Sequence, residues 1–301
     1  MSIKTINPAT NQELKSFDPL TKDQTIAAVE KAHEAFQDWR HVPIDDRAKI
    51  ISKVAATFRE EKEELAKLIT LEMGKRIEES RKEIDFCANI FDFYADGAAE
   101  FLSDEPVEKK GAKPYLQYAP IGVLLGVMPW NFPFYQVTRF AAPNLMAGNT
   151  VLLKHASNVP QCAEKVGEIF ERCGLPAGCF TNLFIPSEFV EAIMSDDRVQ
   201  GASVTGSERA GAAVAGLAGK NLKRSVMELG GNDAFIVLDD ADLENAIQMA
   251  VRGRMVNTGQ SCVAAKRFIV LEEVAQPFIA GFKEALENMK MGDPMDEETE
   301  V

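Results

Sequence analysis

A cysteine in a polar, glycine-containing loop and a glutamate ahead of a glycine pair are the residues of this sequence best suited to chemistry. Cys262 ends the segment 257–262, and Glu228 lies between a Met and a Leu just before Gly230. Taken singly, each has a plainer explanation, because free cysteines are usually small buried hydrophobes and a strand-end glutamate can simply face water. Apolar neighbours favour burial of Glu228, which would raise its pKa and suit it to act as a general base. The pair predicts a thiol that forms an acyl intermediate and a carboxylate that activates water against it.

An asparagine and an arginine follow an apolar, β-branched run over residues 122–128, which is typical of a buried strand. Asn131 stands between two prolines at the end of this run, where ligands bind in α/β sheets. The alternative is a rigid strand-to-helix turn. If a helix begins near Phe134, Arg139 lies in its second turn and can reach back to grip a carboxylate with its guanidinium. The alternative for Arg139 is a surface salt bridge.

Two further segments have the character of an anion site. Lys154 follows the apolar strand 151–153, and a cation at a strand's carboxyl end suits a ribose or a phosphate, although an ordinary solvated lysine fits as well. Gly206 and Ser207 lie between a predicted strand and a predicted helix. Glycine allows close backbone approach, and a helix N-terminus attracts phosphate. A plain turn is the alternative, because the pattern Gly-x-Gly-x-x-Gly occurs nowhere in the chain.

The composition excludes several classes of function. With 33 basic and 46 acidic residues among 301, the net charge is 33 − 46 = −13, which argues against nucleic acid as the main partner. An anionic substrate would need a local cation. Five scattered cysteines without a C-x-x-C pair, and only three histidines, argue against a zinc site and fit a reducing compartment. The N-terminus lacks a signal-peptide stretch and no run approaches membrane-spanning length, so we expect a cytoplasmic protein without a membrane partner.

The expected organisation is helical over the N-terminal third and alternates strand and helix from about residue 105. Such alternation predicts an α/β fold with a parallel sheet wrapped by helices. The expected strands cover residues 113–118, 122–128, 150–153, 180–184, 202–204, 224–229, 234–238 and 266–271. The last ten residues are typical of a turn that leads onward.

Together these segments resemble the aldehyde dehydrogenase superfamily. The matching motifs run in order along nearly the whole chain, at residues 7–10, 129–133, 153–154, 205–207, 228–231 and 259–262. Within the superfamily the chain is most similar to bacterial NAD(P)-dependent succinate-semialdehyde dehydrogenases, on residues 128–133, 154–156, 204–213 and 257–260. His155 supports this assignment to a subgroup, because most members of the superfamily have Pro directly after the lysine that Lys154 matches.

The resemblance implies a Rossmann-type sheet with helices on both faces and the start of a second α/β domain. Residues 1–228 would form the NAD(P)-binding domain, with a bridging or oligomerisation segment near 106–119. Residues 229–301 would form the first part of a catalytic domain that is incomplete here, since the family continues well past this length. The full-length form would be a homodimer or homotetramer.

The resemblance also implies roles for single residues. Cys262 would attack the aldehyde, Asn131 and the Cys262 backbone N–H would hold the oxyanion, and Glu228 would activate water against the thioester. Arg139 would contact the carboxylate of succinate semialdehyde. The cofactor, NAD or NADP, would lie against Met128, Pro129, Trp130, Lys154, Ser157, Gly206, Ser207, Gly211, Leu229 and Gly230.

Two positions depart from relatives. Some of these enzymes carry a second Arg where this chain has Val256, and the nearest cation is Arg254, so the carboxylate grip is incomplete or built differently. NAD-preferring relatives often have Glu at Ser157, so we expect this chain to accept NADP alongside NAD. A truncated, non-catalytic nucleotide-binding or structural derivative of the family is the alternative. A cysteine hydrolase is a third interpretation, but it lacks a nearby histidine.

Overall fold

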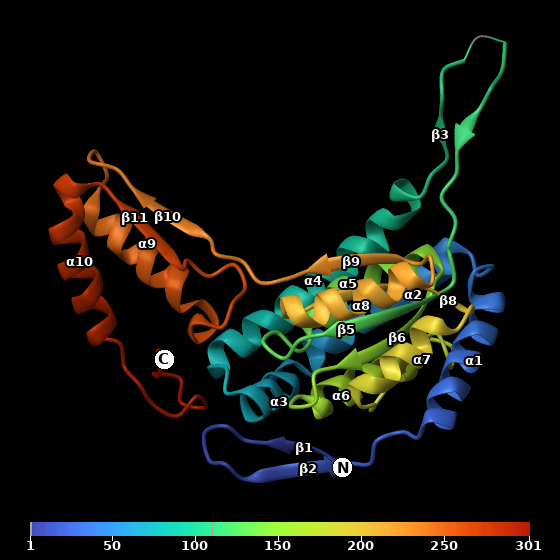
Figure 1. Ribbon diagram of the computed structural model, residues 1–301, viewed down its shortest axis with the longest axis horizontal. Helices are drawn as coiled ribbons and strands as arrows, with labels where there is room; N and C mark the ends of the chain where they lie inside the picture. The colour runs from blue at the N-terminus through green and yellow to red at the C-terminus, as the bar shows by residue number, and fades with distance from the viewer. Residues whose placement is uncertain (1, 110) are drawn as a thin grey trace.

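A five-stranded parallel sheet forms the centre of the larger, N-terminal body in the computed structural model, which describes residues 2–109 and 111–301 (Figure 1). Its strand order is β7-β6-β5-β8-β9. The strands are β5 (Val123–Met128), β6 (Thr150–His155), β7 (Phe180–Asn182), β8 (Val199–Thr205) and β9 (Arg224–Glu228). The parallel α/β sheet predicted from the alternating pattern is therefore confirmed.

The central strand is apolar along its whole length because both of its faces are covered. Leu124 and Met128 join one hydrophobic core, whereas Val123 and Leu125 join another on the opposite face. Successive side chains of a strand point to opposite faces, so an unbroken apolar run is what such a position requires. Helices on both faces, as the resemblance implied, are confirmed.

The first core packs the sheet against α2, α3, α4, α5 and α6, and the second packs it against α1, α7 and α8. These helices are α1 (Lys22–Trp39), α2 (Ile44–Glu60), α3 (Lys62–Met73), α4 (Ile77–Phe101), α5 (Tyr135–Ala147), α6 (Pro160–Arg172), α7 (Val190–Ser195) and α8 (Glu208–Lys220), with a 3-10 turn η1 (Ser187–Phe189) before α7. The capping box predicted at Thr21 and Gln24 is present at the start of α1.

The expectation of an all-helical N-terminal third is wrong at its beginning. Strands β1 (Ile3–Ile6) and β2 (Glu13–Phe17) form an antiparallel hairpin. Most of their side chains are exposed, and only Thr5 and Phe17 are buried. Strands so short and so little buried carry no alternation of apolar and polar residues, which is the sequence pattern that predicts a strand.

The C-terminal residues form a smaller unit beside the body (orange to red in Figure 1). Its strands β10 (Ala234–Val237) and β11 (Arg267–Val270) pair in parallel, and α9 (Leu243–Met255) and α10 (Glu272–Glu287) pack on them around a core that includes Phe278. Strands β9 and β10 belong to different sheets. A domain boundary at residue 228 agrees with this and stays a prediction.

A thin arm projects from the body at β3 (Glu105–Pro106) and β4 (Tyr115–Leu116), within the segment 106–119 expected to bridge or oligomerise (Figure 1). The predicted strand at 113–118 is thus present but shorter, and its role in assembly stays a prediction. Among the described residues, no helix combines the length and the apolar character needed to cross a bilayer.

Candidate active site

A cavity of about 440 Å³ at the carboxyl end of the sheet brings together four of the predicted site residues, Cys262, Glu228, Arg139 and Leu229. Its lining includes Cys262 from the C-terminal unit, Glu228 from the end of β9 and Arg139 from α5. Parallel strands end at the same edge, where Thr205 of β8 pairs with Glu228 of β9. A thiol, a carboxylate and a guanidinium therefore share one space, although they are far apart in the sequence.

Cys262 lies on a sharply turned loop that follows the 3-10 segment η2 (Val256–Gly259). Asn257, Thr258 and Gly259 have φ angles of 55°, 53° and 73°. Asparagine and glycine tolerate the left-handed region, but a β-branched threonine there is strained. Cys262 is half-buried, whereas the other four cysteines are buried. The loop therefore presents one accessible thiol on a backbone that its surroundings must hold in place.

Asn131 does not line the cavity; it is bonded to the loop that carries the thiol. Its Nδ2 donates to the carbonyl of Gln260 at 2.8 Å, and its own carbonyl accepts from Nδ2 of Asn257 at 2.8 Å. The Asn131 Oδ1 is buried, and no protein group among the described residues bonds to it. An amide carries two N–H donors, so one remains for a ligand while the other holds Gln260.

The burial predicted for Glu228 from its apolar neighbours is wrong, since its side chain is 51 % exposed. Strand β9 is the edge strand of the sheet, and most of its residues are exposed. Met227 and Leu229 are only half-buried, so they exclude little water from the carboxylate between them. The carboxylate still faces the cavity, but burial is not what would make it a base.

Arg139 lies in the second turn of α5 (Tyr135–Ala147), as predicted, and its guanidinium points to the end of the sheet. Its Nη2 donates to Thr205 Oγ1 at 3.1 Å, and its Nη1 lies 3.5 Å from Glu228 Oε2. Val256 also lines the cavity. Arg254 does not; its guanidinium lies against Gly259, where an added Cβ would meet Nη2 at 3.3 Å. The second cation that some relatives have is therefore not replaced by Arg254.

Lys154 and Ser157 lie at the end of β6 and in the turn that follows it. Burial lowers the pKa of Lys154, and its Nζ reaches the carbonyl of His155 at 3.4 Å, with no carboxylate partner among the described residues. Burial also lowers the pKa of His155 to about 4, so this ring is neutral at pH 7. Its Nε2 contacts the Pro133 carbonyl at 2.8 Å, and its Nδ1 accepts from the Ala156 N–H at 2.8 Å. The neutral ring thereby links the turn that carries the exposed Ser157 to the Asn131 loop, which is residues 129–133 between β5 and α5.

The residues predicted to meet a phosphate lie at the start of α8. Ser207 caps this helix by accepting from the Ala210 N–H at 3.3 Å, and an added Cβ on Gly206 would meet nothing within 4 Å. Gly211 lies further along α8, and an added Cβ there would come within 2.6 Å of the end of the Leu229 side chain, which would have to move. A helix N-terminus and a cation without a carboxylate partner fit a phosphate-bearing cofactor.

The remaining cofactor candidates lie where β5 and β9 end. Met128 is buried at the last position of β5, Pro129 and Leu229 are half-buried, and Trp130 and Gly230 are exposed. This places them on the same edge of the sheet as the cavity. Their contact with a cofactor stays a prediction.

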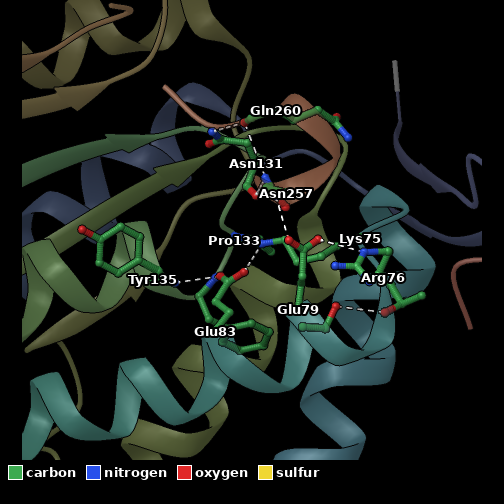
Figure 2. Close-up of polar contacts among 12 residues, drawn as sticks. Lys75, Arg76, Glu79, Glu83, Asn131, Pro133, Tyr135, Asn257 and Gln260 are labelled. Atoms are coloured by element: carbon green, nitrogen blue, oxygen red, sulfur yellow. Dashed lines mark hydrogen bonds and ion pairs between the residues drawn. The ribbon is translucent and has the colours of Figure 1, made fainter. Parts of the chain in front are cut away.

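A buried ion pair behind the Asn131 loop was not predicted from the sequence. Lys75 and Glu83 are 0 % and 2 % exposed and pair with each other, and Lys75 Nζ also lies 3.9 Å from the centre of the Phe132 ring. The other Glu83 oxygen accepts the N–H groups of Phe134 and Tyr135 at 2.9 and 3.0 Å (Figure 2). A carboxylate on the apolar face of α4 was the available signal, since Glu83 shares that face with Ile84 and Cys87.

Comparison with known proteins gives consistent matches along the whole chain. The profile of the aldehyde dehydrogenase family matches residues 1–301. The chain is 48 % identical over 301 residues to a probable NADP(+) succinate-semialdehyde dehydrogenase of Synechocystis sp. and 47 % identical over 304 residues to the NADP(+) succinate-semialdehyde dehydrogenase of Mycobacterium leprae. All of this chain is covered in both cases, and it spans 66 % of the length of these curated relatives.

A solved structure also matches this chain over nearly its whole length. The succinic semialdehyde dehydrogenase of Streptococcus pyogenes, determined in complex with NADP+, superposes with a TM-score of 0.96 at 42 % sequence identity. The match covers 99 % of this chain and 66 % of that one. On its sequence and its fold, the chain belongs to the aldehyde dehydrogenase family.

Proposed function

We propose that this protein oxidises succinate semialdehyde to the carboxylic acid with NADP+, through an acyl thioester on Cys262. One observation carries the proposal: Cys262, Glu228 and Arg139 line a single cavity at the carboxyl end of the sheet. The relatives named for this activity support it. The site supplies a nucleophile, a carboxylate and a cation, which are the groups needed to oxidise an aldehyde that bears a negative charge.

In the proposed reaction, the Cys262 thiolate adds to the aldehyde carbon. The developing oxyanion accepts the Asn131 N–H that Gln260 does not use, and such a donor contributes about 10²–10³ in turnover. Bound NADP+ would supply the acceptor for the hydride that leaves the adduct carbon as the oxyanion re-forms a C=O bond, and this leaves a thioester on Cys262. Glu228 then accepts a proton from the water that attacks the thioester, which releases the acid and restores the thiol.

The cofactor would be held by residues on the adjoining edge of the sheet. Lys154 offers a cation to the ribose, and the N-terminus of α8 at Ser207 offers backbone N–H groups to the pyrophosphate. Ser157 would lie near the adenosine ribose, and a small neutral side chain there leaves room for a 2′-phosphate. These roles follow from the fit described above and from the resemblance to the family.

Arg139 is the proposed partner of the substrate carboxylate. Changing it to Gln should lower kcat/KM for succinate semialdehyde by about 10- to 100-fold, the range expected for loss of a hydrogen bond to a charged group. Butanal, which has the same chain length and no carboxylate, should be little affected. The measurement is initial-rate NADPH formation with each aldehyde.

Lys82 provides the matched control because it is the other cation in the cavity lining. Its side chain is 68 % exposed and is paired with Glu78 at 2.6 Å. Lys82→Gln should leave the preference for the charged aldehyde unchanged. An equal loss for both aldehydes in Arg139→Gln, or a larger loss in Lys82→Gln, would refute the assignment of Arg139.

Ser157 is the position at which the choice of cofactor can be tested. Ser157→Glu places a carboxylate near the expected 2′-phosphate, and like charges repel, so NADP+ should bind about tenfold more weakly or worse. The affinity for NAD+ should stay the same or rise, because a carboxylate can accept hydrogen bonds from both ribose hydroxyls. Calorimetric titration with each nucleotide measures this, with Ser157→Ala as the control, and an unchanged NADP+ affinity in Ser157→Glu would remove Ser157 from the site.

A nucleotide-binding member of the family without turnover is the second candidate. The exposure of the Glu228 side chain, which is 51 %, favours it. NADPH formation by the 301-residue chain separates the two candidates. Turnover supports the oxidation proposed here, whereas nucleotide binding without turnover supports the second candidate.

A further inference from the structure

Glu79 of α4 reaches from the body to the loop that carries the thiol. Its Oε1 accepts the backbone N–H of Asn257 at 2.9 Å (Figure 2). The same residue lines the cavity that Cys262 also lines. The Glu79 side chain is only 15 % exposed, and Asn257 is buried. A carboxylate that accepts a backbone N–H makes a charge-assisted bond, which is stronger than a neutral one.

Asn257 is the point at which the thiol loop and the Asn131 loop meet. Its side-chain amide donates to the carbonyl of Asn131, while the Asn131 amide donates to the carbonyl of Gln260, two residues before Cys262. A contact that fixes the Asn257 backbone therefore also fixes one partner of these two hydrogen bonds between the loops. The other end contains the proposed oxyanion donor.

Glu79 is itself held in place. Arg76 Nε lies 3.5 Å from Glu79 Oε2, and Arg76 Nη1 donates to the carbonyl of Thr299 at 3.0 Å. One turn further along α4, Glu83 accepts the N–H groups that follow the Asn131 loop. One carboxylate of α4 thus bonds to the thiol loop, and another bonds to the residues directly after the Asn131 loop. The spacing of these two loops decides whether thiol and amide can act on one carbonyl.

We propose that Glu79 is a positioning residue for Cys262. Its carboxylate holds Asn257 in the left-handed conformation and so sets where the thiol lies relative to the Asn131 amide. The significance for catalysis rests on the proposed roles of Cys262 and Asn131, but the positioning itself is a property of the loop and can be measured without turnover. Asn257, Thr258 and Gly259 are all in the left-handed region, and Thr258 is strained there because it is β-branched, so contacts from outside the loop must stabilise it.

Three variants separate this role from general stabilisation. Glu79→Ala removes the acceptor of the Asn257 N–H. Glu79→Gln keeps an oxygen at the same distance along the side chain but removes the charge that pairs with Arg76. Glu78→Ala is the matched control, because Glu78 directly precedes Glu79, is 49 % exposed and pairs with Lys82 at 2.6 Å and with Arg76 at 3.7 Å. It removes a carboxylate beside Arg76 without removing the acceptor of the Asn257 N–H.

The measurement is hydrogen exchange of the peptide that spans residues 256–262 in the 301-residue chain. Glu79→Ala should speed its exchange by about tenfold or more, the factor that corresponds to ~1.4 kcal/mol. Peptides from β5 and β6 should keep the wild-type rate. Glu79→Gln should restore most of the protection, and Glu78→Ala should behave as wild type.

Alkylation by iodoacetamide gives a second readout, since Cys262 is half-buried and the other four cysteines are buried. Release of the loop should expose the thiol, so Cys262 should react faster in Glu79→Ala and return toward the wild-type rate in Glu79→Gln. Wild-type exchange and alkylation in Glu79→Ala would overturn the proposal. So would a failure of Glu79→Gln to rescue, or an equal effect of Glu78→Ala. A failure of the proposed oxidation would instead appear as absent turnover with these loop effects intact.

Discussion

Changing Cys262 to Ala is expected to lower succinate-semialdehyde-dependent NADPH formation by on the order of 10⁴-fold or more, which is the scale of loss when a catalytic nucleophile is removed. Among the lining residues that the structure describes, Cys262 carries the one thiol. A thiol can attack a carbonyl and carry the acyl intermediate. Without the thiol, the hydride would have to come from the hydrated aldehyde, and the proposed mechanism contains no group that activates water to form this hydrate. NADP+ binding should be unaffected.

The control for this prediction is Cys173→Ala, because Cys173 is buried in the first core and lies outside the cavity. It should retain turnover in proportion to the folded fraction. Initial rates and nucleotide affinity, measured on both variants, test the prediction. Appreciable NADPH formation by Cys262→Ala would show that the reaction does not pass through this thiol.

Changing Glu83 to Gln is expected to destabilise the fold by ~3–5 kcal/mol, the cost typical of leaving one partner of a buried ion pair alone. Lys75 would lose its carboxylate partner in a site where it is fully buried against the Phe132 ring. The bonds to the start of α5 would also weaken. The measurement is the urea midpoint at unchanged slope.

Two controls make the Glu83 prediction specific. The double variant Lys75→Met with Glu83→Gln should be less destabilised than Glu83→Gln alone, because it no longer buries an unpaired charge. Asp92→Asn breaks the exposed pair with Arg59, whose N–O distance is 2.6 Å, and should cost no more than ~1 kcal/mol. If Glu83→Gln costs no more than Asp92→Asn, the buried pair does not stabilise the fold as argued here.

The central sheet could be predicted from the sequence because its signals are local. The apolar segment that forms β5, followed by Asn131 and then by Arg139 in the second turn of a helix, appears in the structure as the pattern indicated. The position of Cys262 near Glu228 could not come from periodicity. It followed from pairing two chemical types and from the resemblance to a known family.

The errors have a common physical cause, which is that burial depends on what packs against a segment. Glu228 has apolar neighbours in sequence, yet it lies on an edge strand and is exposed. Glu83 shares the apolar face of its helix with Ile84 and Cys87, but its pairing with Lys75 depends on a residue outside that helix. Glu79 bonds to a residue 178 positions away, so no local pattern could reveal it. Sequence reasoning therefore identified the groups that we propose to react and missed the groups that position them.

The central claim is that Cys262 carries an acyl group during turnover, and trapping that group tests it most directly. Glu228→Gln should slow hydrolysis of the thioester, so the acyl enzyme should accumulate when this variant is mixed with NADP+ and succinate semialdehyde. After an acid quench, mass spectrometry of the digest should find one succinyl group on the peptide that contains Cys262, and none when NADP+ is omitted. NADPH formation with an unmodified Cys262 peptide, or the acyl group on another residue, would contradict the account.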